Sequence, residues 1–252
     1  MNDPHALLAI ALTGVVAGFV NTVAGGGSLL TLPALMLAGL PADVANGTNR
    51  VGVVLQSASG VVGFRRAGRL SLASLPALSL PTVTGAALGA WLAADVLPRD
   101  LVEPALMAAL AVVALVMLFA PPNEGGDSVE PPSLRERPGV ALGLFLAGLY
   151  GGFVQAGVGF VLLAVLGRGL RIDLVRANAI KLSLVMLFGI VALGIFVAKD
   201  QVAWAPGLRL AGATVVGAQL GVRFARRVPA RALKRRVVVC ALASCAAVVL
   251  RG

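Results

Sequence analysis

A long apolar run near the N-terminus is interrupted by Asn21-Thr22-Val23-Ala24-Gly25-Gly26-Gly27-Ser28. Three consecutive glycines open the backbone, and lipid offers an open backbone no hydrogen-bonding partner. The break must therefore face protein or a watery cavity. The run that follows, near 28–38, presents free N–H groups and the positive end of a helix dipole, which suits an anion. The alternative interpretation is a tight hairpin turn whose glycines allow close helix packing.

The sequence around this break is that of a polytopic membrane protein. Of its 252 residues, 58% are hydrophobic and 13% are charged, whereas a soluble domain carries about 25% charged residues. A span needs about 20 apolar residues, so the chain has room for eight. Lys and Arg number 21 against 11 Asp and Glu. These cations lie between apolar runs and aromatic residues are few, so the charge indicates membrane orientation and argues against nucleic acid as a partner.

Eight long apolar segments are bounded by charged residues, proline and glycine. They lie at roughly 6–24, 43–64, 71–94, 101–120, 138–156, 174–197, 203–225 and 231–250. Two shorter runs, near 28–38 and 158–168, are too short to cross a bilayer alone at about 1.5 Å per residue. We expect each to fold back against the preceding helix as a half-helix. The polar stretch 121–137 is predicted to be a cytoplasmic linker between two transmembrane halves, 1–120 and 138–252.

The two halves are related by a constant offset of 132 residues. This offset aligns Ala24-Gly25-Gly26-Gly27 with Ala156-Gly157-Val158-Gly159 and aligns Asn46 with Asn178. It also aligns a Gly-rich stretch at 85–89 with one at 217–221. Apolar segments match by chance at many offsets, but asparagine and clustered glycine rarely do. The sequence therefore predicts an internal duplication.

The charges predict that the second copy is inverted. Cytoplasmic loops carry the excess of Lys and Arg. Arg65, Arg66 and Arg69 follow the 43–64 segment, whereas Lys199 and Asp200 occupy the equivalent loop. Both termini are then outside and the linker is inside. Inverted repeats with interrupted helices are typical of secondary transporters, whose substrate site lies near the midplane. The predicted fold is all-α, with two inverted-topology repeats, each a broken-helix hairpin plus three full transmembrane helices.

A second group of polar residues lies in the first turns of the 43–64 and 174–197 segments. A cation inside a span is costly and usually faces a polar interior or an ion path. Under inversion, Arg50 and Lys181 approach the midplane from opposite faces and together clamp one anion. The alternative is that each snorkels to its nearer interface or bonds a neighbouring carbonyl. The predicted substrate-binding residues are Asn21, Gly25, Gly26, Gly27, Ser28, Asn46, Thr48, Asn49, Arg50, Gln155, Gly157, Gly159, Asn178 and Lys181.

Other chemistries find little support. All 11 acidic residues lie at span ends or in loops, which argues against a carboxylate proton relay and against a cation site. His5 is the only histidine, and the residues of a nucleophilic catalytic set are missing. We therefore expect no enzyme, no metal and no cofactor. Cys240 and Cys245 are given no role, and Gln56 and Gln219 are expected to form inter-helical hydrogen bonds or to line the cavity.

The motifs resemble those of a known family. They run from Ala17-Gly18 through Asn21-Thr22 to Gly25-Gly26-Gly27-Ser28 and Pro33, then Gly39-Leu40-Pro41 and Ala45-Asn46-Gly47-Thr48-Asn49-Arg50. This pattern resembles the TauE/SafE family of sulfite exporters, also called sulfonate uptake permeases. The resemblance covers essentially the whole chain. It implies a multi-pass secondary permease of the bacterial or archaeal inner membrane for sulfite, sulfonates or related organosulfur anions. Val158 and Lys181 depart from the motif in the second half.

Two alternatives remain. A cation-coupled permease for a neutral or zwitterionic metabolite would share the architecture. A membrane scaffold subunit is the other, with a partner protein on the Arg-rich 223–236 stretch, although a topology signal explains that stretch better. The expected partners are a small anion and the lipid bilayer. The direction of transport, the coupling ion and a homo-oligomer are left open.

Overall fold

The computed structural model describes residues 4–70, 75–119, 134 and 137–224, and all its elements are helical. The first half contains α1 Pro4–Val23, α2 Ser28–Leu37, α3 Ala42–Arg66, α4 Leu75–Trp91 with a π-helical turn Leu92–Val96, and α5 Arg99–Phe119. The second half contains α6 Pro138–Phe153, α7 Val158–Ala164 with a π-helical turn Val165–Gly169, α8 Leu174–Ala198, and α9 Trp204–Phe224. The prediction of an all-α fold is confirmed.

Seven of the predicted long segments and both short ones correspond to helices with bounds that differ by a few residues. The predicted start of the 71–94 segment lies outside the described residues, and α4 is described from Leu75. The segment 231–250, both cysteines and most of the linker 121–137 lie outside the described residues. The two short runs fold back as expected, because α2 packs against α1 and α7 packs against α6.

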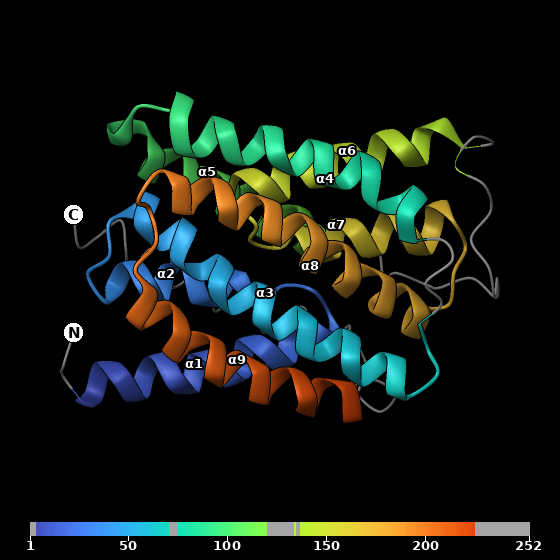
Figure 1. The fold of residues 1–252 in the computed structure, drawn as a ribbon, viewed down its shortest axis with the longest axis horizontal. Helices are drawn as coiled ribbons and strands as arrows, with labels where there is room; N and C mark the ends of the chain where they lie inside the picture. Colours follow the sequence, from blue (N-terminus) through green and yellow to red (C-terminus); the bar gives the residue numbers. More distant parts are fainter. Residues whose placement is uncertain (1–3, 71–74, 120–133, 135–136, 225–252) are drawn as a thin grey trace.

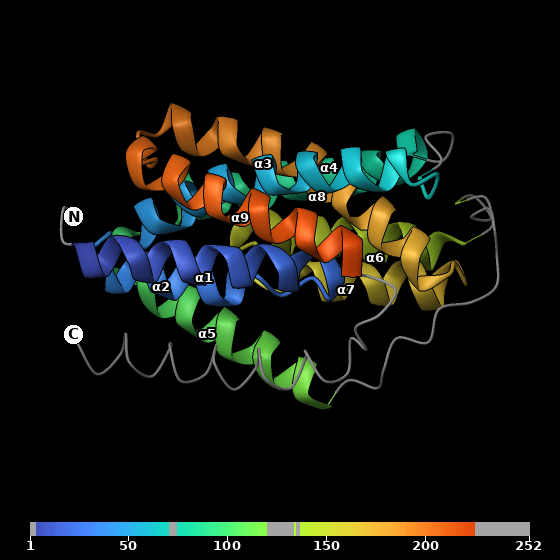
Figure 2. The same cartoon turned by 90° about the horizontal axis from the view of Figure 1, so that it is seen from below.

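Helices of the two halves correspond at the predicted offset. Shifting α3 by 132 residues gives the bounds of α8, and the shifted α1 and α2 fall on α6 and on α7 with its π turn. Figure 1 shows α3 and α8 running in opposite directions across the bundle, and the same holds for α4 and α9. The packing is exchanged between halves, since α1 packs on α9 and α6 packs on α4. Figure 2, in which the bundle is seen from below, shows α1 beside α9 on the side that faces the viewer.

Glycines spaced four apart bring these helix pairs together. A Cβ built on Gly85 or Gly89 of α4 would lie 2.1 or 2.0 Å from a carbonyl oxygen of α6. A Cβ on Gly217 of α9 would lie 2.0 Å from a carbonyl oxygen of α1. Small residues at this spacing let helix backbones approach closely, which is how helices associate in a membrane. The duplicated glycine stretches are therefore packing surfaces between the halves.

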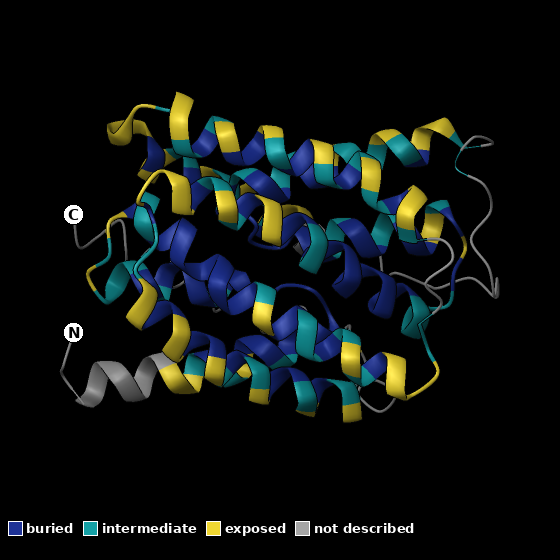
Figure 3. Ribbon diagram, in the orientation of Figure 1, coloured by how far each residue is buried: buried dark blue, intermediate teal, exposed yellow. Residues whose placement is uncertain are grey.

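The burial pattern is that of a protein in lipid. Buried residues gather in the middle of the bundle and exposed ones on its outside (Figure 3), and the exposed set includes large apolar side chains such as Leu80 at 69% and Val116 at 59%. Trp91 and Trp204 are exposed at one end of the bundle, where tryptophan suits a membrane interface. Two helices are long and apolar enough to cross a membrane by length and composition, Leu75–Val96 and Leu174–Ala198.

Charged residues are found at both ends of the bundle. The C-termini of α3 and α9 and the N-terminus of α8 share one end (Figure 1), which carries arginines such as Arg65, Arg66 and Arg223. The other end carries Asp95, which pairs with Lys199. The arginine end is the one for which the sequence predicts a cytoplasmic location, and this orientation stays a prediction. The two helix breaks and the buried cations Arg50 and Lys181 lie between these ends.

Candidate functional site

The first break joins α1 to α2. The α1 helix ends at Val23 and α2 begins at Ser28. Gly25 adopts a left-handed φ of +97°, which an L side chain rarely takes, and its N–H donates to the Val20 carbonyl at 3.0 Å. A Cβ on Gly27 would lie 2.1 Å from the Ala17 carbonyl oxygen. Gly25 therefore makes the turn, and Gly27 lets α2 return closely along α1.

The second break repeats this geometry between α6 and α7. Gly157, the counterpart of Gly25, has a φ of 74°, and Gln155 is also left-handed at 67°. The Tyr150 hydroxyl donates to the Ala156 carbonyl at 2.5 Å and so satisfies one open carbonyl of the break. The sequence pattern predicted the glycine here. It gave no sign of a left-handed Gln155, because glutamine rarely adopts that conformation.

The two breaks touch each other. A Cβ on Gly25 would lie 2.5 Å from the carbonyl carbon of Gly159, and a Cβ on Gly159 would lie 2.5 Å from the Cα and carbonyl oxygen of Gly25. A Cβ on Gly26 would meet the ring of Phe160 at 2.4 Å. Only backbone fits at this crossing, so glycine is required by the neighbouring half of the molecule as well as by the turn.

Arg50 of α3 binds the C-terminal end of α6. It is fully buried, and its terminal nitrogens donate to the carbonyls of Gly151 at 3.1 Å, Phe153 at 3.4 Å and Gly152. A further N–H donates to Gln155 Oε1 at 2.9 Å. The guanidinium carbon lies 4.5 Å from the centre of the Phe196 ring. A cation at a helix C-terminus is favourable because that end carries unpaired carbonyls and partial negative charge.

Lys181 of α8 does the same for α1. It is fully buried, and its ammonium donates to the carbonyls of Asn21 at 2.7 Å and Thr22 at 3.4 Å. It also donates to Asn178 Oδ1 at 2.8 Å. The carbonyls at the broken end of α1 are thereby satisfied inside the protein, as lipid surroundings require.

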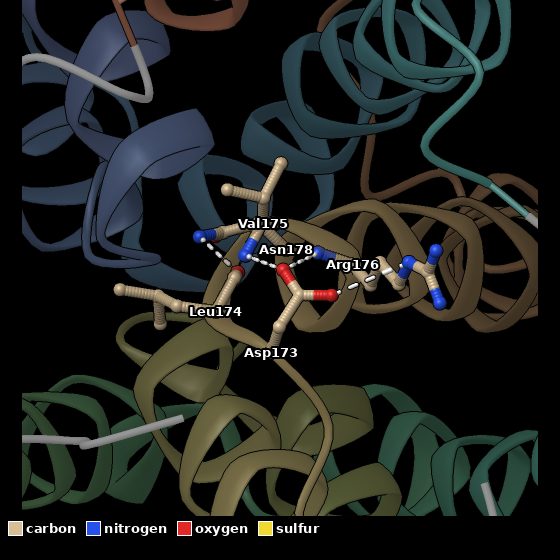
Figure 4. Close-up of polar contacts among 5 residues, drawn as sticks. All are labelled: Asp173, Leu174, Val175, Arg176 and Asn178. Carbon is tan, nitrogen blue, oxygen red and sulfur yellow. Dashed lines mark hydrogen bonds and ion pairs between the residues drawn. The ribbon is translucent and has the colours of Figure 1, made fainter. Parts of the chain in front are cut away.

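The start of α8 fixes the position of Asn178. Asp173 caps the helix by accepting from the backbone N–H groups of Val175 at 3.0 Å and Arg176 at 3.2 Å, and its other oxygen pairs with the Arg176 side chain (Figure 4). Asn178 Nδ2 donates to the Leu174 carbonyl at 3.0 Å. Its Oδ1 is then the atom left to receive the Lys181 ammonium.

The two sets of contacts are counterparts. Asn46 and Asn178 are equivalent by the offset, and so are Asn21 and Phe153. Asn46 Nδ2 donates to the Phe153 carbonyl at 2.8 Å, and Lys181 donates to the Asn21 carbonyl. Each half thus caps the broken helix of the other half; we call these contacts the exchanged caps. The exchanged caps correspond to the alternative interpretation, in which each cation donates hydrogen bonds to neighbouring carbonyls. That both cations also bind one anion stays a prediction.

The remaining predicted residues are also buried. Ser28 is 4% exposed. Thr48 Oγ1 accepts the Ala203 N–H at 2.9 Å and so ties α3 to the loop before α9. Asn49 Oδ1 accepts from Thr31 Oγ1 at 2.6 Å. Three neighbouring side-chain donors lack a hydrogen-bond partner. Two of them, Asn49 Nδ2 and Arg50 Nε, belong to consecutive residues of α3, and the third is Nε2 of Gln155, whose Oε1 contacts Arg50.

Some neighbours of the site were not predicted from the sequence. Thr31 orients Asn49, Tyr150 satisfies the second break, and Phe196 stacks on Arg50. Thr31 is a polar residue in the first turns of the short apolar run after the Gly-rich stretch, and that position could have marked it as a site residue. Gln219 bonds Ser59 across a helix interface, which is the inter-helical role expected for it.

Ionic groups of the opposite sign do not approach the buried cations in the described part of the chain. The ion pairs there, Arg176 with Asp173 and Lys199 with Asp95, lie at the bundle ends. Among the same residues, no three histidine, cysteine or acidic side chains gather where they could hold a metal ion. The site is therefore cationic and rich in N–H donors.

Comparison with known proteins identifies the family. The family model described as "Sulfite exporter TauE/SafE" matches residues 10–248. The "Probable membrane transporter protein ORF9" of a Sinorhizobium species is 32% identical over 247 residues, which cover 95% of this chain and 90% of that protein. The "Probable membrane transporter protein" of Haemophilus influenzae is 29% identical, covering 86% of this chain and 85% of its own length.

The "Probable membrane transporter protein YfcA" of Escherichia coli K12 is 29% identical over 233 residues, covering 89% of this chain and 82% of that protein. The family match spans nearly all of the chain, including both breaks and both buried cations. The helical bundle with its apolar exterior fits the membrane location of these relatives. The chain therefore belongs to the TauE/SafE family and is a membrane transporter.

Proposed function

We propose that this protein is a secondary transporter that moves a small sulfur-containing anion, such as sulfite or a sulfonate, by alternating access. The observation that carries the proposal is the pair of fully buried cations, Arg50 and Lys181, which contact neutral oxygens and no carboxylate within the described residues. A buried charge is costly without a counter-charge. An anionic substrate would supply that counter-charge.

The helix ends compensate part of the buried charge. A helix C-terminus is equivalent to roughly half a negative charge, so each exchanged cap leaves a positive remainder in surroundings where water is scarce. A single anion close to both caps would compensate the remaining positive charge of both cations. The absence of deep acidic residues from the sequence agrees with this proposal, because a cation site would need carboxylate ligands. The family description, "Sulfite exporter TauE/SafE", suggests oxidised sulfur as the class of anion.

The arrangement of the halves supports alternating access. Corresponding helices such as α3 and α8 run in opposite directions (Figure 1), and the breaks contact each other at Gly25 and Gly159. We propose that the halves 1–120 and 138–252 are inverted repeats joined by a cytoplasmic linker, in the inner membrane of a bacterium or archaeon. Rocking of one repeat against the other would expose the anion to each side in turn.

Transport into proteoliposomes tests the proposal. Purified protein is reconstituted, and uptake of labelled sulfite and of a labelled aminosulfonate is compared with uptake of a neutral amino acid. We expect saturable sulfur-anion uptake that Arg50→Gln or Lys181→Gln reduces by at least tenfold. Lys199→Ala is the matched control, since this cation lies at an exposed bundle end. Uptake of neutral solutes without anion uptake would contradict the proposal and favour the neutral-metabolite permease.

A further inference from the structure

We propose that the oxygens of the anion are bound by three unpartnered N–H donors, Asn49 Nδ2, Arg50 Nε and Gln155 Nε2, which we call the donor site. The inference rests on the proposed transport of an anion and assigns the contacting atoms. The other polar residues of the centre have a structural role, because the N–H groups of Asn46, Asn178 and Lys181 already donate to helix carbonyls or, for Lys181, also to Asn178.

Each free donor of the donor site has a fixed orientation. Asn49 Oδ1 is held by Thr31 Oγ1 at 2.6 Å, which points its amide nitrogen away from Thr31. Gln155 Oε1 is held by Arg50 at 2.9 Å, which fixes the direction of its own nitrogen. The two terminal nitrogens of Arg50 are held by carbonyls, which leaves Nε. All three side chains are at most 1% exposed.

The donors belong to one neighbourhood. Asn49 and Arg50 are consecutive on α3, and Gln155 touches Arg50. Thr31 lies in the first turns of α2, so Asn49 also joins this group to the N-terminal end of α2, which carries partial positive charge. The sequence predicted free N–H groups at this end, but those of Leu29, Leu30 and Thr31 donate to the carbonyls of Gly26 and Gly27. Buried N–H groups almost always have a partner in folded proteins. Three that lack one, of which one is the Nε of a buried guanidinium, indicate an occupant that accepts hydrogen bonds.

The chemistry of the donor site selects one kind of head group. Every unpartnered atom of the donor site is a donor, so the ligand must present acceptors at this end. The three oxygens of sulfite or of a sulfonate meet this need. An ammonium group offers only donors and would face both the guanidinium and the N–H groups. For an aminosulfonate, the sulfonate therefore enters the donor site and the amine points away.

Gln155→Glu is the sharpest test, because it places a carboxylate where Gln155 Oε1 now meets Arg50. The new carboxylate acts as a built-in anion and removes one donor. We expect the variant to melt at a higher temperature than the parent without ligand, and to bind anions about 10- to 100-fold more weakly. The loss of anion affinity is the result that discriminates, since replacing a purely structural glutamine would leave anion binding as it is in the parent.

Asn49→Leu is the second variant, with Gln56→Leu as its matched control. Gln56 lies on the same helix, is buried, and also has an unpartnered Nε2, but it is two turns away from Arg50. Thermal unfolding of the detergent-purified full chain is followed in increasing sodium sulfite and sodium ethanesulfonate, with sodium chloride at equal ionic strength as the reference. We expect Asn49→Leu to lose affinity by about 10-fold and Gln56→Leu to keep it.

The outcomes separate the two proposals. If neither sulfur anion stabilises the parent protein beyond chloride, the proposed function is wrong. If both anions stabilise the parent and also stabilise Gln155→Glu and Asn49→Leu to the same degree, the donor site is wrong while anion transport stands. Ethylammonium chloride stabilising the parent as strongly as ethanesulfonate would overturn the selection for acceptor groups.

Discussion

Replacing Gly25 with alanine probes the contact between the two helix breaks. Gly25 has a φ of +97°, and a left-handed conformation costs an alanine about 1–2 kcal/mol. The added Cβ would also lie 2.5 Å from the Gly159 carbonyl carbon, and overpacking of this kind costs about 1–3 kcal/mol. We expect Gly25→Ala to lower the free energy of unfolding by about 2–5 kcal/mol.

Two further glycines separate these contributions. Gly39 has nearly the same φ, +95°, but a Cβ there meets nothing within 4 Å, so Gly39→Ala carries the backbone cost alone, about 1–2 kcal/mol. Gly159 is a residue of the helix α7, so Gly159→Ala carries the contact cost alone, about 1–3 kcal/mol. The pair Gly25→Ala and Gly39→Ala therefore isolates the effect of the opposite half at matched backbone conformation.

Thermal unfolding of the purified protein in detergent measures the difference. In a chain of this size, about 1 kcal/mol corresponds to about 2–4 °C, so Gly25→Ala should melt about 2–12 °C below Gly39→Ala. Sulfite uptake should fall in Gly25→Ala and Gly159→Ala and persist in Gly39→Ala. Equal melting temperatures for Gly25→Ala and Gly39→Ala would refute the reasoning, because they would show that the breaks do not touch.

Three other experiments address the caps, the orientation and the bundle ends. Lys181→Met leaves two buried carbonyls at the end of α1 without a donor, so we expect a loss of about 2–4 kcal/mol in unfolding free energy; an unchanged denaturation midpoint would contradict the capping role. With the native cysteines replaced, an impermeant maleimide should label Asp200→Cys on intact cells and Arg66→Cys only after permeabilisation, and the reverse pattern would disprove the orientation. Lys199→Ala breaks the exposed ion pair with Asp95, and its melting temperature should match the parent at low and high salt because exposed pairs stabilise little; a large decrease would be inconsistent with that.

The helices and breaks could be predicted closely from the sequence, because their causes are local. Charge and proline bound the apolar runs, and glycine opens the backbone wherever it occurs. The repeat offset helped further, because it aligned Gly157 with Gly25 and Asn178 with Asn46 and so predicted a second break and a second polar site. Left-handed Gln155 escaped prediction because its conformation depends on surrounding contacts and its residue type gives no signal.

The partners of the buried cations could not be predicted, because they are more than 100 residues away in the chain. The sequence showed that Arg50 and Lys181 are costly inside spans, and this restricted their surroundings to polar groups. It could not distinguish an anion from helix carbonyls, since both offer oxygen to a cation. Thr48 illustrates the same limit: its place in a polar cluster suggested a ligand role, whereas its hydroxyl accepts an N–H of the distant residue Ala203.

The exchanged caps mean that neither half is complete by itself. A first half produced alone would leave Arg50 without the α6 carbonyls that receive its protons, and the end of α1 without an ammonium. Such a fragment would need an antiparallel second copy to supply what it lacks. Because both halves lie in one chain, each keeps beside it in the membrane the neighbour whose carbonyls and cation it needs.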